Sequence, residues 1–159
     1  MIAGGLNLFF YFYVILILVV GADQLTKGLV QRSLALHQSQ KVIPGVVAFT
    51  RINNPGAAFG ILRERTVLLV AAPVLLFFLA FFFRKEIRKH PLVFRLGLAF
   101  CLGGAAGNLI DRIFNGGQVI DFIDLEFWPL ENFPVFNLAD SAICLGALLL
   151  VYGLSKIEN

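Results

Sequence analysis

The sequence has few of the residues on which metal sites and disulfide frameworks depend. Only two cysteines and two histidines occur among 159 residues. Cys101 and Cys144 lie in apolar runs without CxxC spacing. We expect two buried free thiols, because reduced cysteine packs as a small hydrophobe. His37 and His90 lie in separate polar stretches and no HExxH sequence is present, so zinc hydrolysis has no support. We therefore expect no metal and no cofactor.

The signatures of nucleophilic catalysis and nucleotide binding are missing as well. None of the serines lies in a GxSxG sequence, so a Ser-His hydrolase is not expected. No P-loop and no GxGxxG sequence is present. The formal net charge is only +3, and the basic residues form no stripe interleaved with aromatic residues. This pattern does not favour a nucleic-acid partner.

Charge is scarce, and its absence from long stretches indicates the fold class. Charged residues make up 14% of the chain and hydrophobic residues 58%, with a mean hydropathy of +0.84. A soluble domain of this size needs less apolar surface than that, whereas a small polytopic membrane protein needs it. Four stretches contain no charged residue: 1–22, 66–83, 96–110 and 141–155. We predict a single membrane-embedded domain over residues 1–159, with transmembrane helices at about 6–22, 66–83, 92–110 and 136–154.

The first apolar stretch resembles a signal peptide in its position only. No basic segment precedes it, and its apolar run is too long for the core of a typical signal peptide. Three further spans follow it. We therefore interpret it as a retained helix.

Two long polar connections separate the predicted spans. Residues 28–65 contain β-branched residues and the turn signals Pro44-Gly45 and Asn53-Asn54-Pro55-Gly56, which predict short strands with tight turns. Open sheet edges do not survive in lipid, so this β-rich piece belongs outside the hydrocarbon. Residues 111–135 combine acidic and aromatic side chains, as interfacial segments do. The predicted fold is an all-α polytopic membrane protein with four transmembrane helices, connecting loops and a small extracytoplasmic β-sheet.

The orientation follows from the short loop 84–90, in which four of seven residues are basic. Residues 28–65 carry at least as many basic residues, but the positive-inside rule holds best for short loops. We therefore place the short loop and both termini in the cytoplasm and both long connections outside. The same basic loop suits attraction to anionic lipid.

Asp121 and Asp140 are the most informative residues of the chain. Asp140 opens the apolar run of the fourth span, and a carboxylate at membrane depth is costly and usually functional. In the predicted orientation Asp23, Asp111 and Arg112 reach the same membrane face as Asp140. Asp121 belongs to the connection at that face. Two converging carboxylates suggest a shared proton and an activated water.

Structural interpretations of these polar residues stay open. Asp140, which shares a helix face with Asn137, is also typical of a helix N-terminus, where the dipole favours an acid. Asp111 and Arg112 are equally consistent with an ion pair that closes a helix end, while Asn108 lies deeper and indicates a polar cavity. Asp23 and Lys27 are four residues apart and can pair. The other acids of the second connection are by default solvated, and spacing alone does not separate Asp121 from one of them: Asp124, Glu126 and Glu131.

Five short motifs give the chain a resemblance to bacterial lipoprotein signal peptidase, also called signal peptidase II. Each motif is weak alone, but five in order with the right spans between them are specific. The motifs are Asp23-Gln24-Leu25-Thr26-Lys27, Asn54-Pro55-Gly56-Ala57-Ala58-Phe59, Gly104-Ala105-Ala106-Gly107-Asn108-Leu109-Ile110-Asp111-Arg112, Val119-Ile120-Asp121-Phe122 and Phe136-Asn137-Leu138-Ala139-Asp140.

The resemblance implies an aspartic endopeptidase of the bacterial inner membrane, with its active site near the extracytoplasmic face. We expect the chain to act as a monomer, although the sequence itself does not give the oligomeric state. Its partners would be membrane lipid and prolipoproteins that carry a diacylglyceryl cysteine, and it would cleave just before that cysteine to release the signal peptide. The family's catalytic pair corresponds to Asp121 and Asp140, which would activate a water. Its other polar positions, for substrate binding or support of the pair, correspond to Asp23, Asn54, Asn108, Arg112 and Asn137.

Two functions from other classes compete with this hypothesis. Intramembrane carboxylates also serve proton relays in transporters and channels. A relay favours acids stepped along the membrane depth, whereas the acids here gather at one end. The other alternative is an assembly subunit in which polar residues only lock helices together.

Overall fold

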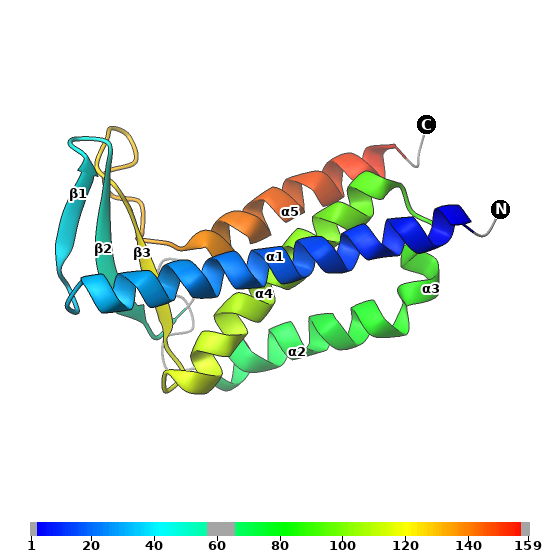
Figure 1. Cartoon of the computed structure of the whole chain (residues 1–159), viewed down its shortest axis with the longest axis horizontal. Helices are drawn as coiled ribbons and strands as arrows, with labels where there is room; N and C mark the ends of the chain where they lie inside the picture. The colour runs from blue at the N-terminus through cyan, green and yellow to red at the C-terminus, as the bar shows by residue number, and fades with distance from the viewer. Residues whose placement is uncertain (1–2, 57–65, 157–159) are drawn as a thin grey trace.

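The computed structural model describes residues 3–56 and 66–156, without the side chains of residues 3–9 and of Thr66. Four helices run lengthwise: α1 (Ala3–Ser33), α2 (Thr66–Phe82), α4 (Leu92–Phe114) and α5 (Leu138–Ser155). A single turn, α3 (Arg84–Ile87), links α2 to α4 at the end where both termini lie (Figure 1). The strands β1 (Ser39–Ile43), β2 (Val47–Asn54) and β3 (Val119–Leu125) form a sheet at the other end.

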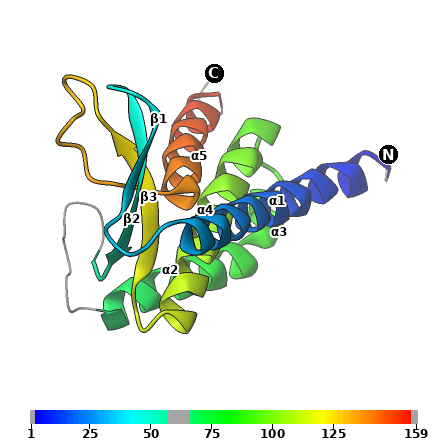
Figure 2. The same ribbon diagram turned by 60° about the vertical axis from the view of Figure 1, so that its left-hand side comes forward.

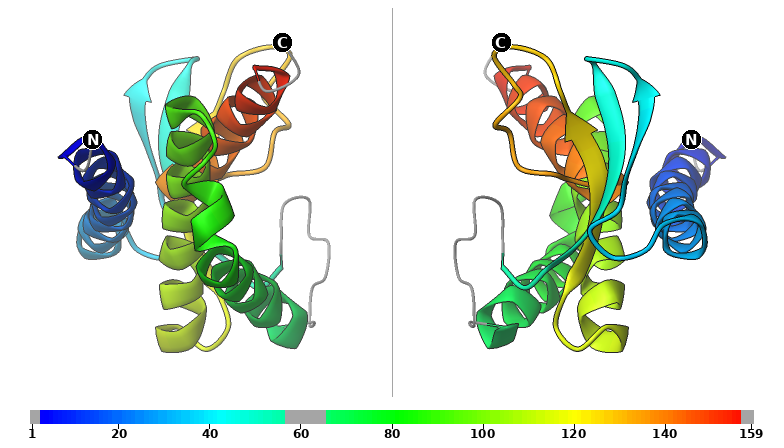
Figure 3. Two further views of the ribbon diagram at one scale, coloured as in Figure 1. Left: turned by 90° about the vertical axis from the view of Figure 1, so that its right-hand side faces the viewer. Right: turned by 90° about the vertical axis from the view of Figure 1, so that its left-hand side faces the viewer.

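Helix α4 is the centre of the bundle, with α1 on one side and α2 and α5 on the other (Figure 3). Glycines allow its close approach to α5. A Cβ atom at Gly97 would lie 2.8 Å from the carbonyl oxygen of Gly146, and a Cβ atom at Gly146 would lie 2.6 Å from that of Gly97. Small residues are the usual means of packing helices in lipid, where no hydrophobic force draws them together.

Within the residues that the structure describes, three helices are long and apolar enough to cross a membrane: Phe10–Ser33, Leu92–Phe114 and Leu138–Ser155. The second predicted span corresponds to α2, an apolar helix of 17 residues, which is at the short limit for a membrane span. Large apolar side chains on the outer faces are exposed, among them Ile17 at 65% and Leu148 at 70%. Such continuous apolar surface indicates contact with lipid.

Helices α1 and α4 extend beyond their predicted ends. We predicted that the first span ends at Ala22 because charged residues follow, yet α1 continues to Ser33. Asp23 and Lys27 remain within the helix because they neutralise each other in the protein interior, with Lys27 Nζ 2.8 Å from Asp23 Oδ2. The pairing of these two residues, predicted from their spacing, is thus confirmed.

The sheet confirms the short strands predicted in residues 28–65, where β1 and β2 lie, and adds a third strand, β3. β1 and β2 form an antiparallel hairpin whose turn contains Gly45 at φ 71°, a left-handed conformation that glycine adopts without strain. β3 pairs antiparallel with β2, with Ile52 opposite Asp121. This strand was not predicted, because residues 111–135 were interpreted only as an interfacial segment. The sheet stands across the helix ends, as Figure 2 shows, and carries Asp121 towards α4 and α5.

Candidate active site

Asp121 is buried on β3 and is held by two amide groups. Its side chain is 3% exposed. Asn54 Nδ2 donates to its Oδ2 over 2.8 Å, and Asn137 Nδ2 donates to its Oδ1 over 2.6 Å. Asp124 lies three positions further along the strand and therefore on the opposite face, where it accepts a hydrogen bond from Thr50 Oγ1 at 2.6 Å. Strand alternation thus separates the two acids that spacing had left equivalent.

Asp140 lies in the first turn of α5 and takes part in a capping box. Asn137 Oδ1 accepts from the Asp140 amide over 2.9 Å, and Asp140 Oδ2 accepts from the Asn137 amide over 3.3 Å. Asn108 Nδ2 on α4 donates to Asp140 Oδ1 over 2.8 Å. The helix-terminal interpretation of Asp140 is therefore correct and compatible with a functional one, because its side chain also faces a cavity.

Both aspartates line one cavity of about 520 Å³. Its polar wall includes Asn54, Asn108 and Arg112, and Arg112 Nη2 donates to the carbonyl oxygen of Gly56 over 3.1 Å. The remaining wall is mostly apolar and is formed by Val119, Leu125, Leu130, Phe133, Pro134, Val135, Phe136, Ile143 and Cys144. An apolar cavity with a few converging polar groups is the usual form of a ligand site.

Burial raises the pKa of Asp121 to about 7. Loss of solvation disfavours the ionised carboxylate, and the negative charge of Asp140 adds to the rise. The hydrogen bonds from Asn54 and Asn137 and the charge of Lys27 act in the opposite direction. Asp121 therefore changes protonation near neutral pH, as a general acid or base requires.

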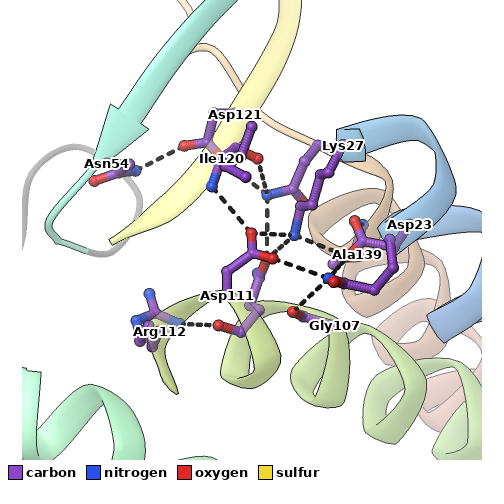
Figure 4. A network of polar contacts seen from close by, with 12 residues as sticks. Asp23, Lys27, Asn54, Gly107, Asp111, Arg112, Ile120, Asp121 and Ala139 are labelled. Atoms are coloured by element: carbon purple, nitrogen blue, oxygen red, sulfur yellow. Dashed lines mark hydrogen bonds and ion pairs between the residues drawn. The ribbon is translucent and has the colours of Figure 1, made fainter. Parts of the chain in front are cut away.

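A second, fully buried polar group adjoins the cavity without lining it (Figure 4). Asp23, Lys27 and Asp111 are each at most 2% exposed. Lys27 Nζ lies 2.8 Å from Asp23 Oδ2 and 2.9 Å from Asp111 Oδ2. Asp23 Oδ1 accepts from the Ala139 amide over 3.0 Å, and Asp111 Oδ2 accepts from the Ile120 amide over 3.0 Å. This group joins α1 and α4 to the chain just before both aspartates of the cavity.

Most of the seven predicted site residues lie together. Five line the cavity: Asn54, Asn108, Arg112, Asp121 and Asp140. Asn137 is fully buried and contacts both aspartates. Asp23 belongs instead to the buried group that does not line the cavity.

Other expectations about polar residues need correction. Asp111 pairs with Lys27 and not with Arg112 among the described residues. Lys27 and Asp111 were missing from the predicted site. Two features of the sequence could have identified them: both residues lie within the five motifs, and Lys27 lies four residues after Asp23. Cys144 is exposed and lines the cavity, and Cys101 is half-buried, so the prediction of two buried thiols was wrong. The described part of the chain contains no cluster of three or more His, Cys, Asp or Glu suited to a metal.

Comparison with known sequences agrees with this arrangement. The signal peptidase (SPase) II family matches residues 15–156. The lipoprotein signal peptidase of Syntrophotalea carbinolica is 43% identical over 138 residues, which cover 84% of this chain and 84% of the relative. The lipoprotein signal peptidase of Halalkalibacterium halodurans is 39% identical over 149 residues, which cover 93% of this chain and 94% of the relative.

Solved structures show the same fold. A bacterial membrane enzyme determined by the in meso method at 2.3 Å is similar, with a TM-score of 0.81 and 33% identity, covering 92% of this chain and 88% of that chain. A second, determined at 1.9 Å, has a TM-score of 0.77 and 32% identity, covering 91% of this chain and 92% of that chain. The chain belongs to the signal peptidase II family and is a membrane aspartic endopeptidase of that type.

Proposed function

We propose that this chain removes the signal peptide from diacylglyceryl-modified prolipoproteins by cleaving just before the lipidated cysteine, with Asp121 and Asp140 as the catalytic pair. The observation that carries the proposal is the convergence of these aspartates, from a strand and a helix, on one cavity with an apolar wall. Such a wall suits an apolar signal peptide, and the paired acids supply hydrolytic chemistry.

The proposed reaction uses one proton shared by the pair. The ionised carboxylate takes a proton from a water held between the two aspartates, and the water oxygen attacks the scissile carbonyl carbon. The protonated carboxyl donates its proton to the carbonyl oxygen. When the tetrahedral intermediate collapses, the C–N bond breaks and the departing amine takes up the proton that one aspartate holds, while a hydroxyl group of the intermediate returns its proton to the other aspartate. One peptide bond and one water are consumed, and the pair again holds its single shared proton.

The polar residues around the pair have distinct proposed roles. Asn54 and Asn137 each donate to Asp121, and Asn108 donates to Asp140, so these amides fix both carboxylates. Arg112 lines the cavity and is proposed to bind carbonyl groups of the substrate backbone or the developing oxyanion. Asp23 supports the pair through the start of α5 and does not contact the substrate.

The proposed placement in the membrane follows the arrangement of polar and apolar parts. The sheet stands at one end of the bundle and the basic turn α3 at the other (Figure 1). The cavity adjoins the sheet, because residues of β2 and β3 line it. We place the sheet and the active site at the extracytoplasmic face of the bacterial inner membrane and both termini in the cytoplasm. In this placement α2 crosses the membrane as well as the three longer helices, which gives four spans. The whole chain forms one peptidase domain, and the enzyme acts as a monomer.

The test is cleavage of a purified lipidated prolipoprotein by the purified chain. We expect release of the signal peptide, undiminished by a chelator. Cleavage that requires the diacylglyceryl group confirms the substrate class, whereas equal cleavage of the unmodified precursor contradicts it. Absence of cleavage, together with proton flux across vesicles that contain the protein, would instead support a proton relay.

A further inference from the structure

Lys27 is a buried ammonium group that has no direct contact with either catalytic aspartate. It is 1% exposed and does not line the cavity. Besides its ion pairs with Asp23 and Asp111, it donates to Asn108 Oδ1 over 2.9 Å. An ammonium group has three N–H donors and no acceptor, so these three contacts use its full capacity. Lys27 therefore presents a hydrogen-bond donor, and nothing else, to Asn108.

This contact permits one orientation of the Asn108 amide. Its Oδ1 also accepts from Asn137 Nδ2 over 3.1 Å, and its Nδ2 donates to Asp140 Oδ1 over 2.8 Å. Exchanging oxygen and nitrogen would set an NH₂ group against two donors, and a buried unsatisfied polar group costs about 1–3 kcal/mol. The amide N–H faces Asp140 because the amide oxygen must face Lys27.

We propose that Lys27 is a positioning residue for the peptidase reaction, acting through Asn108 to keep a hydrogen-bond donor directed at Asp140. The inference rests on the proposed function, since it concerns the reactivity of that carboxyl group. A positioning role differs from general support of the fold: it predicts that Lys27 and Asn108 act as one unit on the chemical step.

A double-mutant cycle with Lys27→Met and Asn108→Ala tests this unit. We expect each single variant to lower kcat about 10- to 100-fold with KM changed less than about threefold, and the double variant to be no worse than the poorer single one. Lys27→Met/Asp111→Asn keeps the net charge of the buried group unchanged and still loses the donor. This charge-conserving variant replaces Lys27→Met in the test if Lys27→Met does not fold. Lys41→Met, an exposed lysine on β1, is the matched control and should retain full activity.

The outcomes separate this inference from the proposed function. If the unmodified chain fails to cleave prolipoprotein, the proposed function itself fails. If it cleaves and the losses from Lys27→Met and Asn108→Ala multiply in the double variant, Lys27 does not act through Asn108. A folded Lys27 variant with unchanged kcat overturns the inference directly.

A second cavity carries an independent inference at the opposite end of the helices. It has a volume of about 170 Å³ and is bordered by Phe12 on α1, Phe77 on α2 and Leu102 on α4. Arg84 on α3 supplies the one charged side chain among its lining residues. Phe81 at its edge is 66% exposed, so the cavity opens to the surroundings of the helices.

The charge around this cavity selects the kind of occupant. The Arg84 guanidinium lies 4.4 Å from the centre of the Phe81 ring, and Lys85, Arg88 and Lys89 follow within the next turns. The single acid of the segment, Glu86, is paired with Lys89. A ligand with an apolar chain and an anionic head complements this combination. We propose that an anionic membrane phospholipid binds here, with an acyl chain in the cavity and its phosphate at Arg84.

Native mass spectrometry of the detergent-solubilised chain tests this lipid site. With phosphatidylglycerol and phosphatidylethanolamine of equal chain length, we expect at least fivefold greater retention of phosphatidylglycerol. Arg84→Gln should abolish the preference, and Ala80→Phe, which fills the cavity, should reduce retention of both lipids. Lys156→Gln, a basic residue outside the cavity, is the control and should keep the preference. Equal retention of the two lipids by the unmodified chain, or a preference that survives Arg84→Gln, overturns the proposal.

Discussion

Two pairs of acids, all buried except the half-buried Asp140, lie side by side in this protein, and their neighbours make them chemically different. Asp23 and Asp111 share the ammonium group of Lys27 and also accept backbone N–H groups. Asp121 and Asp140 receive hydrogen bonds from neutral amides, and in the described part of the chain neither forms an ion pair with a lysine or arginine. The negative charge of the first pair is compensated by the Lys27 ammonium group, whereas the second pair has no such cation bound to it among the described residues.

The difference explains how one small bundle separates structure from chemistry. A cation between two carboxylates offsets their negative charge and fixes the helices that carry them. Neutral donors orient carboxylates and leave them able to exchange a proton, which Asp121 does near neutral pH because its pKa is raised to about 7 by burial. Substitution in the pair Asp121 and Asp140 should therefore mainly lower activity, whereas substitution in the pair Asp23 and Asp111 should mainly lower stability.

The largest expected effect is on activity. Asp121→Asn and Asp140→Asn should each lower kcat at least about 10³-fold, because an amide neither abstracts nor donates the proton. The measurement is prolipoprotein cleavage under single-turnover conditions. Asp124→Asn, on the other face of β3, is the matched control and should stay within about twofold of the unmodified chain. Normal cleavage by Asp121→Asn or Asp140→Asn would show that the substituted aspartate is not required for the reaction.

The compensated pair should instead determine stability. Asp23→Ala leaves the Lys27 ammonium with one carboxylate and frees the Ala139 amide, so we expect about 3–5 kcal/mol of destabilisation. Denaturant unfolding in detergent measures this, with Asp121→Asn compared under the same conditions. Equal destabilisation by both substitutions would contradict the contrast between the pairs.

The pH dependence of activity should show the proton on the uncompensated pair. Below about pH 7 Asp121 retains its proton, and above that pH it ionises, so the general acid is lost. We expect kcat/KM to decline about tenfold per pH unit well above pH 7. The measurement is the initial cleavage rate between pH 5 and 9 at fixed ionic strength. A flat profile to pH 9 would contradict a raised pKa in the free enzyme.

Thermal stability should follow the same titration with a smaller amplitude. The folded-state pKa of Asp121 lies above the ordinary value of 3.8, so folding favours the protonated form. This contribution is complete below about pH 4 and is lost as the pH rises through about 7. We expect Tm to decline by a few degrees from pH 5 to pH 8, and Asp121→Asn to show less of this decline. A Tm that rises from pH 5 to pH 8 in the unmodified chain, but not in Asp121→Asn, would contradict a raised pKa of Asp121 in the folded protein.

The sequence predicted the helices and the polar residues better than their connections. Charge-free stretches located every helix of the bundle, since exclusion of charge is a local property. The end of α1 was predicted too early, because Asp23 and Lys27 are enclosed in the protein only when α4 packs against them and Asp111 joins the pair. Pairing between distant residues leaves little local signal, and β3 was missed for the same reason.

The motifs predicted which residues make up the site, but not which of them line the cavity and which lie buried behind it. Spacing left Asp121 and Asp124 equivalent, and the motif around Asp121 selected it. The strand conformation of residues 119–125 adds the physical reason, because it directs the two acids to opposite faces. Asp23 was predicted either to bind the substrate or to support the pair, because motifs record which residues matter and not how deep they lie. An ion pair between Asp111 and its neighbour Arg112 was one open interpretation, whereas the fold brings a lysine from α1 to Asp111.

The two aspartates of the cavity lie on the last strand and the last helix that the structure describes, and a single side chain, Asn137, contacts both. During synthesis the cavity is therefore incomplete until β3 has paired with β2 and α5 has packed on α4. An intramembrane peptidase built in this order has no assembled active site while it is still being inserted.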